Sequence, residues 1–156
     1  MKTAIIYASM HHGNTKKLID KIAKKHDVCL IDIIKDKQID LSKYDCIGIA
    51  SGIAFGKFYS QMNQFIETNL PNHKKVFLLY SYGSKRKGYT DNIKSILSLK
   101  HCEVLGEYGC LGFDTYGPFK VIGGISKGHP DIEEINGALT FYESLNLEDW
   151  YCVIIK

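Results

Sequence analysis

The segment that follows the first apolar run of the chain is rich in small polar residues that could hold an anion. It spans residues 9–15, SMHHGNT, and helical spacing begins directly after it. A strand, a short polar loop and a helix leave several backbone N–H groups unpaired beside the positive end of a helix dipole. Ser9, Asn14 and Thr15 add side-chain donors. Gly13 lets the backbone approach a bound group. The loop therefore predicts a phosphate site, with an ordinary helix cap as the structural alternative.

Several well-known signatures do not fit this segment. The P-loop pattern G-x-x-x-x-G-K-[ST] and the dinucleotide pattern G-x-G-x-x-G are both missing. A receiver domain needs acidic residues at the strand ends, whereas the first strand ends in Tyr7-Ala8-Ser9. A metal site at the adjacent His11 and His12 is not favoured, because no further His, Cys or carboxylate lies at a suitable local spacing. Near a phosphate, a protonated imidazole would instead act as a cationic donor.

Apolar runs bounded by turn signals recur along the chain and predict five strands. Each run is continuously apolar rather than alternating, which is typical of strands that are covered on both faces of a parallel sheet. Helical spacing of apolar residues lies between the runs. The expected strands are Ala4–Tyr7, Val28–Ile31, Cys46–Ala50, Val76–Tyr80 and about Val104–Leu111, and the expected helices lie around Leu18–Ala23, Phe58–Ile66, Ile93–Leu97 and Ile132–Leu145.

Alternating strands and helices predict an α/β fold, a three-layer sandwich around a doubly wound five-stranded parallel sheet of order 2-1-3-4-5. Lys35–Asp45 barely has room for a helix, so a short or irregular crossover is expected there. The ligand crevice of such a sheet lies beyond the carboxyl ends of its strands. The loops expected to border it are 9–15, 51–58, 81–89 and 112–129. The sequence pattern assigns the apolar tail Trp150–Ile155 to no strand or helix of this fold.

Composition narrows the class of protein. The chain has 156 residues, 45% of them hydrophobic and 24% charged, which predicts one packed domain over residues 1–156. A net charge of +3, with basic residues spread along the chain, does not favour nucleic-acid binding. No segment reads as a membrane span or a secretory signal. Five widely spaced cysteines without a C-x-x-C pair fit reduced thiols, so we expect a cytoplasmic protein.

Residues 9–15 resemble the phosphate loop of the flavodoxin family, which reads roughly [ST]-x-T-G-x-T after the first strand. The segment here is one residue longer and carries two histidines in its middle, similar to a variant of small flavodoxin-domain proteins of bacteria and archaea. The likeness extends over Lys2–Leu145. The residues that match in kind are Ser9, Gly13, Asn14 and Thr15.

The resemblance implies flavin mononucleotide (FMN) as cofactor, with its phosphate in the first loop and its isoalloxazine ring between the loops after the third and fourth strands. Aromatic side chains there could stack on the ring, as Phe55, Tyr82 or Tyr89 would. Tyr89 fits a loop anchor too, and Phe58 fits a core position equally well. The implied cofactor-binding residues are Ser9, Met10, His11, His12, Gly13, Asn14, Thr15, Ala54, Phe55, Gly56, Lys57, Phe58, Ser81, Tyr82 and Gly83.

The segment 112–130 is too long and glycine-rich for a simple connection. Long loops at a ligand edge are often functional, and this one could lay Phe113, Asp114 or Tyr116 beside the flavin or form a partner surface. It could equally pack on itself, closed by Pro118. Both interpretations remain open at this point.

The expected function is electron transfer between redox partners by an FMN-binding, flavodoxin-like protein. The expected partner is a redox protein or a small-molecule electron donor or acceptor. Family members that dock with basic partners are strongly acidic. Here Lys57 and residues 85–87, KRK, lie at the expected flavin rim, which favours acidic partners or substrates. One alternative is an FMN-dependent oxidoreductase acting on a quinone, porphyrinogen or nicotinamide cofactor, because loop 51–58 also resembles that of flavodoxin-like protoporphyrinogen oxidases. Another is an interaction module that has lost the flavin.

Overall fold

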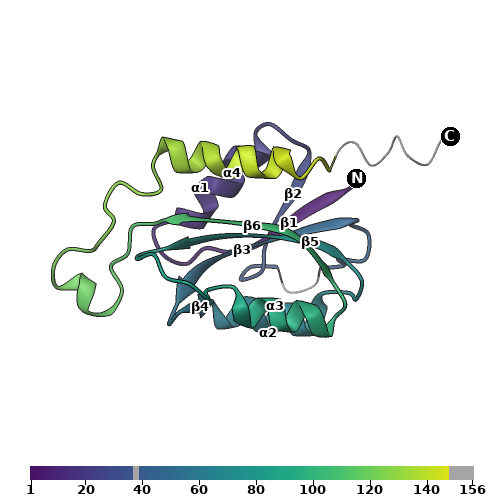
Figure 1. The fold of residues 1–156 in the computed structure, drawn as a ribbon, viewed down its shortest axis with the longest axis horizontal. Coiled ribbons are helices and arrows are strands. Elements are labelled where there is room, and N and C mark those ends of the chain that lie inside the picture. The colour runs from purple at the N-terminus through teal and green to yellow at the C-terminus, as the bar shows by residue number, and fades with distance from the viewer. Residues whose placement is uncertain (37–38, 148–156) are drawn as a thin grey trace.

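A single sheet lies between two layers of helices in the computed structural model, which describes residues 1–36 and 39–147 (Figure 1). The strands are β1 (Thr3–Ala8), β2 (Val28–Asp32), β3 (Cys46–Ala54), β4 (Lys57–Phe58), β5 (Lys75–Tyr82) and β6 (Glu103–Leu111). The helices are α1 (Asn14–Ala23), α2 (Ser60–Asn69), α3 (Asp91–Leu99) and α4 (Ile132–Ser144), with a short 3-10 helix η1 (Gly117–Lys120).

The five long strands are all parallel and follow the order β2-β1-β3-β5-β6. This is the predicted order 2-1-3-4-5 once the short β4 is left out, so the predicted doubly wound fold is confirmed. β4 is an addition that the sequence pattern did not indicate, and it pairs antiparallel with the end of β3. The register brings the carboxyl ends of the central strands to one edge, where Ala8 lies opposite Ser51 and Gly52 lies opposite Ser81.

The continuous apolar runs are explained by two cores, one on each face of the sheet. Figure 1 shows α1 and α4 together on one face and α2 and α3 on the other. Neighbouring residues of β1 point to opposite faces. Ile5 packs with α1 and α4, whereas Ile6 packs with α2 and α3. Because both faces are covered, every position of β1 is buried.

The start of the second helix differs from the sequence-based expectation. Phe58 was expected within a helix over Phe58–Ile66, but it pairs with Ile53 in β4, and α2 begins only at Ser60. Its side chain enters the same core as Met62 of the helix. Phe58 lies four residues before Met62, which is a helical spacing, although it reaches the shared core from β4. This is why the sequence pattern was misleading.

The connection between β2 and β3 contains no helix or strand within its described residues, 33–36 and 39–45, in line with the expected irregular crossover. Leu41 and Tyr44 of this connection are buried in the core on one face of the sheet. None of the helices in the described ranges is both long and apolar enough to cross a bilayer. The tail Trp150–Ile155 lies outside the described residues.

Candidate functional site

A cleft of about 200 Å³ opens at the carboxyl edge of the sheet, between the loops that follow β1, β3, β5 and β6. It lies where the sequence placed the crevice of a doubly wound sheet. The implied cofactor-binding residues that line it are Ser9, His11, Asn14, Thr15, Ala54, Phe55, Gly56, Ser81, Tyr82 and Gly83. Of the remaining ones, Met10, Lys57 and Phe58 line an adjoining groove that shares His11, Ala54 and Phe55 with the cleft, and His12 lines a cavity on the other side of Asn14.

The loop after β1 presents the start of α1 without a side-chain cap. His12 and Gly13 both have positive φ, 53° and 65°, and Gly13 is the residue that precedes the helix. No side chain among the described residues accepts a hydrogen bond from the first turn, and this turn holds no acidic residue. The helix-cap alternative therefore does not describe this loop. The backbone N–H of Asn14 donates to the carbonyl oxygen of His11 at 3.5 Å. The N–H groups of Thr15 and Lys16 have no acceptor among the described residues and are available to an anion.

Hydroxyl and amide groups surround this helix start. Thr15 Oγ1 lies 2.9 Å from Ser81 Oγ, and both side chains are buried. Ser9 Oγ is buried with no hydrogen-bond partner among the described residues. The amide of Asn14 donates to the carbonyl oxygen of Phe113 at 2.8 Å. A buried hydroxyl without a partner is unfavourable, so a bound acceptor at Ser9 would relieve a cost that the polypeptide alone leaves in place. This donor set fits a phosphate group.

The second loop is the tip of a hairpin formed by β3 and β4. Ala54 pairs with Lys57, so Phe55 and Gly56 form a two-residue turn with φ of 52° and 78°. Positive φ at both central residues is typical of a type I′ turn. This conformation is costly for a bulky residue such as phenylalanine, and its ring is 83% exposed. A strained and exposed aromatic residue at the mouth of a cleft is a candidate for ligand or partner contact.

Phe58 lies elsewhere. Its side chain is only 1% exposed and belongs to the core between β3, α2 and α3, so the core alternative describes its packing. Its neighbour Tyr59 lines the cleft instead, and the sequence analysis missed it. The interpretation of Phe58–Ile66 as one helix hid the hairpin arm that positions Tyr59. Burial, and after it the negative charge of Asp114, raises the pKa of Tyr59 to about 12, so its phenol stays neutral.

The third loop is held by two tyrosines. The rings of Tyr82 and Tyr89 stack with centroids 5.5 Å apart, and the Tyr89 hydroxyl donates to the carbonyl oxygen of Ser84. Tyr89 is buried, so it anchors the loop while also lining the cleft. A side chain at Gly83 would overlap Asp114 of the long loop, which explains why the two segments can approach so closely only with glycine here.

The long loop 112–130 packs on itself and also borders the cleft. Its contact with a flavin or a partner stays a prediction. The loop projects beyond the sheet at the left of Figure 1. Asp114 and Ile125 form an antiparallel bridge that closes the loop. The side chains of Phe113, Asp114 and Tyr116 line the cleft. The ring of Tyr116 meets that of Phe55 edge to face at 5.5 Å.

Side chains of the other loops fasten this segment. His12 Nε2 lies 2.8 Å from Thr115 Oγ1, and Ser126 Oγ donates to the carbonyl oxygen of Gly83 at 2.8 Å. Together with the bond from Asn14 to Phe113, these contacts join three loops that are far apart in the sequence.

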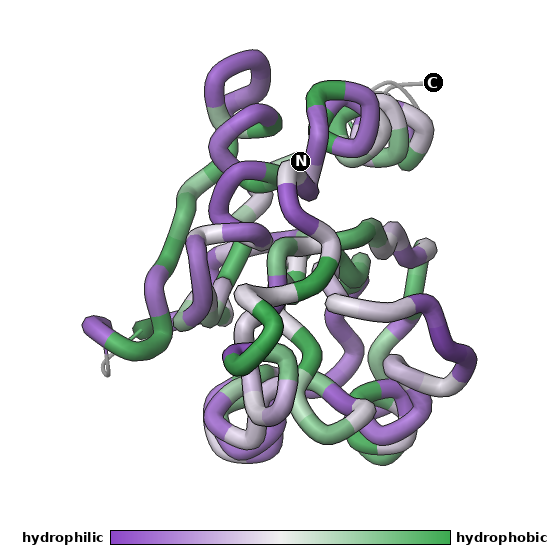
Figure 2. The backbone as a smooth tube through the Cα atoms, turned by 90° about the vertical axis from the view of Figure 1, so that its left-hand side faces the viewer, coloured by the Kyte–Doolittle hydropathy of each residue, from purple (hydrophilic) through white to green (hydrophobic). Residues whose placement is uncertain are grey.

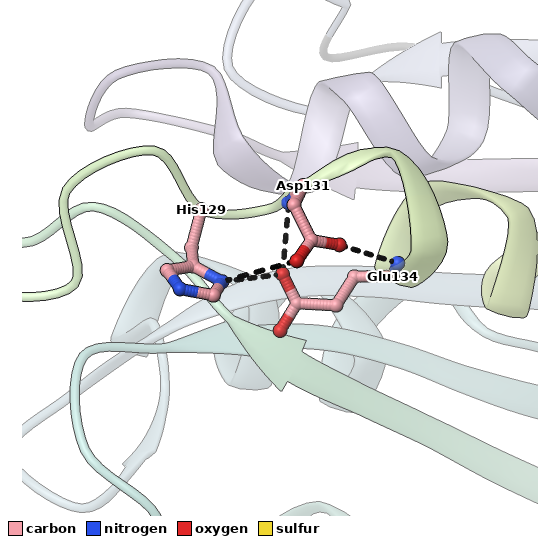
Figure 3. A group of neighbouring side chains, drawn as sticks. All are labelled: His129, Asp131 and Glu134. Carbon is pink, nitrogen blue, oxygen red and sulfur yellow. Dashed lines mark hydrogen bonds and ion pairs between the residues drawn. The ribbon is translucent and has the colours of Figure 1, made fainter.

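A cluster of His129, Asp131 and Glu134 fixes the other end of the long loop to α4 (Figure 3). Asp131 and Glu134 form a capping box, in which each side chain accepts a hydrogen bond from the other residue's backbone N–H. His129 Nδ1 lies 2.7 Å from Glu134 Oε2, and this hydrogen bond raises the pKa of the imidazole. The donor atoms could approach a metal ion, but they are already engaged with one another and with the helix start. We therefore interpret the cluster as a structural latch.

Fold and cleft together define a flavodoxin-like α/β protein with a polar loop and an uncapped helix start after its first strand. The chain belongs to the flavodoxin domain family, whose sequence pattern matches residues 4–119. This confirms the resemblance noted from the sequence. An uncharacterized protein of Methanocaldococcus jannaschii is 35% identical over 147 residues, which cover 93% of this chain and 98% of that one.

Two solved structures have the same fold over nearly their whole lengths. A flavodoxin from the domain Archaea superposes with a TM-score of 0.66 and 19% identity, covering 94% of this chain and 99% of that one. General stress protein 14 of Treponema denticola, in complex with FMN, gives a TM-score of 0.65 and 11% identity, covering 93% and 99%.

Proposed function

We propose that the protein binds FMN in the cleft and transfers electrons through it. The observation that carries this proposal is the start of α1. Its first turn has no side-chain cap and no acidic residue, and the nearby hydroxyl of Ser9 has no hydrogen-bond partner among the described residues. Backbone N–H groups and a hydroxyl donor suit a phosphate group, and membership of the flavodoxin domain family makes FMN the group to test.

The roles of the chain in this proposal follow from its contacts. Residues 9–15 would hold the phosphate, and the loops 52–56 and 81–83 would flank the flavin ring. The bound flavin supplies the electron-transfer chemistry, and the protein orients it and limits its contact with water. Tyr59 lines the cleft and is uncharged at physiological pH. Arg86 and Asp114 are the charged side chains among the described lining residues.

The first test separates the phosphate from the rest of the cofactor. The protein is purified, its visible spectrum is recorded, and any released cofactor is identified. The apoprotein is then titrated with FMN and with riboflavin, which lacks the phosphate, while flavin fluorescence is followed. We expect FMN to bind at least 100-fold more tightly, because several charge-assisted hydrogen bonds of about 1.5–3 kcal/mol each depend on the phosphate. Equal affinities for the two compounds would contradict the proposed phosphate site.

Ser9→Ala sharpens the same test. The variant removes a hydroxyl that has no protein partner, so the thermal stability of the apoprotein should not fall. FMN affinity should drop by roughly 10- to 100-fold, and riboflavin affinity should stay the same. Ser98→Ala, in which an α3 residue away from the cleft is changed, is the matched control. A loss of apoprotein stability with unchanged FMN affinity would show that Ser9 has a structural role only.

We propose further that the protein is an electron carrier and does not turn over a small substrate. The support for this proposal is the exposed hairpin tip at the mouth of the cleft, which leaves room for contact with a second protein. The reduced protein is mixed with a protein electron acceptor in a stopped-flow instrument, and a separate assay follows NADH oxidation in the presence of a quinone. Rapid single reoxidation without steady NADH consumption is the expected result. Sustained, quinone-dependent NADH consumption would identify an oxidoreductase instead.

A further inference from the structure

Exposed apolar side chains gather around the mouth of the cleft. Met10, Phe55 and Tyr116 line one groove beside it, and all three are exposed. Two aliphatic residues of the long loop that carries Tyr116 are exposed as well: Val121 is 90% exposed and Ile122 is 69% exposed. We call these five residues the apolar patch. Exposed apolar surface that is rimmed by polar residues often marks a site of protein contact.

Exposed cations lie on the loops at this end of the molecule. Three loops at the carboxyl edge of the sheet carry them, and none of these side chains forms an ion pair with a carboxylate in the described part of the chain. Elsewhere, Lys16 pairs with Asp20 and Lys94 pairs with Glu107. We call the unpaired group the basic rim: Lys57, Lys85, Arg86, Lys87, Lys120 and Lys127, all of them exposed.

Negative charge is sparse among the residues that line the cleft. Asp114 is the carboxylate among the described residues that line the cleft, and its Oδ1 accepts a hydrogen bond from the backbone N–H of Tyr116 at 2.7 Å. It is only partly exposed and lies against Gly83, so it offers the partner little free charge. Figure 2 looks onto this end of the molecule and shows hydrophilic and hydrophobic loop segments side by side. The surface thus combines an apolar centre with a positive border.

We propose that the apolar patch and the basic rim form the docking surface for an acidic electron-transfer protein. This inference rests on the proposed function, because it brings the partner to the mouth of the proposed flavin cleft. Opposite charge steers the encounter of two proteins, and desolvated apolar contacts at the centre hold the complex. Single-stranded nucleic acid is the competing ligand, because Phe55 and Tyr116 are exposed aromatic residues on which a base could stack. Val121 and Ile122 have no aromatic face and favour a protein partner.

The test is an NMR titration of the isotope-labelled full chain, in its apo and FMN-loaded forms, with an acidic plant-type ferredoxin as the probe. A basic cytochrome c serves as the oppositely charged probe. With ferredoxin we expect backbone shift changes at residues of the patch and the rim. Binding should weaken roughly tenfold between low and 0.2 M salt, since exposed charges are screened over about 8–10 Å at physiological salt. Cytochrome c should give no saturable shifts.

Two sets of charge variants show whether position matters rather than net charge. The test variant carries Lys85→Gln, Lys87→Gln and Lys120→Gln, and the matched control carries Lys21→Gln, Lys24→Gln and Lys25→Gln at the far end of α1. The test variant should bind ferredoxin roughly tenfold more weakly, and the control should change affinity less than twofold. Val121→Ser with Ile122→Ser should weaken binding severalfold and leave its salt dependence intact.

Several outcomes would overturn the proposal. The surface is not a specific docking site if the two triple variants weaken binding equally or if the shifted residues lie away from the patch and the rim. Saturable binding of an oligothymidylate with the same footprint, tighter than that of ferredoxin, would identify a nucleic-acid surface. FMN titrations of the same samples are evaluated separately. A protein that docks ferredoxin as expected without taking up FMN would disprove the proposed function and retain the docking surface.

Discussion

Thr15 Oγ1 lies 2.9 Å from Ser81 Oγ, and this buried contact joins the start of α1 to the end of β5. Each hydroxyl has one proton to donate, and a single bond between the two uses only one of them. The other proton is therefore available to an acceptor in the cleft, whichever of the two residues donates. The pair thus connects the fold to the proposed phosphate site.

Replacing Thr15 tests this connection. Thr15→Val keeps the shape of the side chain and leaves Ser81 Oγ without its partner, so the free energy of unfolding should fall by about 1–3 kcal/mol. FMN affinity should fall as well. Urea unfolding and FMN titration measure the two effects. Thr68→Val is the control, because Thr68 Oγ1 donates to a backbone carbonyl on the exposed side of α2.

A double-mutant cycle completes this experiment. Ser81→Ala alone should also destabilise the protein, whereas Thr15→Val combined with Ser81→Ala should cost less than the sum of the single changes, since neither hydroxyl is then left unpaired. Strict additivity would show that the two hydroxyls do not depend on each other in solution.

The two phenylalanines of the hairpin should respond in opposite ways. Phe58→Ala removes a ring that is 1% exposed and should lower the free energy of unfolding by about 3–5 kcal/mol. Phe55→Gly should leave stability unchanged or raise it slightly, because glycine adopts the positive φ of 52° without strain. Urea unfolding of the apoproteins measures both. If Phe55→Gly destabilises as strongly as Phe58→Ala, the exposed position of the hairpin tip is wrong.

The layout of the sheet could be predicted because its cause is local. Four of the five long strands contain a continuous apolar run, and Glu107 interrupts the run in β6. The residues of the proposed phosphate loop follow β1 directly in the sequence. The contacts that shape the cleft are not local. The hydrogen bond from Asn14 to Phe113 joins residues 99 positions apart, and no pattern in a single sequence indicates such a partner. Phe58 was misplaced because its spacing from Met62 suits a helix as well as it suits a hairpin arm.

The long loop should control access to the cleft. The cleft volume of about 200 Å³ is below the roughly 300–1,000 Å³ typical of small-molecule sites, so we expect the loop to shift when a flavin enters. The contacts of Tyr116 with Phe55 and His11 hold it near the mouth. Tyr116→Ala should therefore speed both FMN association and release severalfold. Stopped-flow fluorescence measures the rates, with Tyr44→Phe in the connection between β2 and β3, away from the cleft, as a control. Unchanged rates would mean that another segment limits entry.

The latch between His129 and Glu134 should make stability depend on pH. The hydrogen bond to Glu134 raises the pKa of the folded imidazole above its ordinary value of 6.5. Its stabilising contribution is therefore complete below pH 6.5 and is lost as the pH rises through the raised value. Urea unfolding of the apoprotein between pH 5.5 and 8.5 should show stability declining over this window. His129→Gln and Glu134→Gln should each flatten the decline, since each removes one charge of the pair. A wild-type decline retained in both variants would assign the pH dependence to other residues.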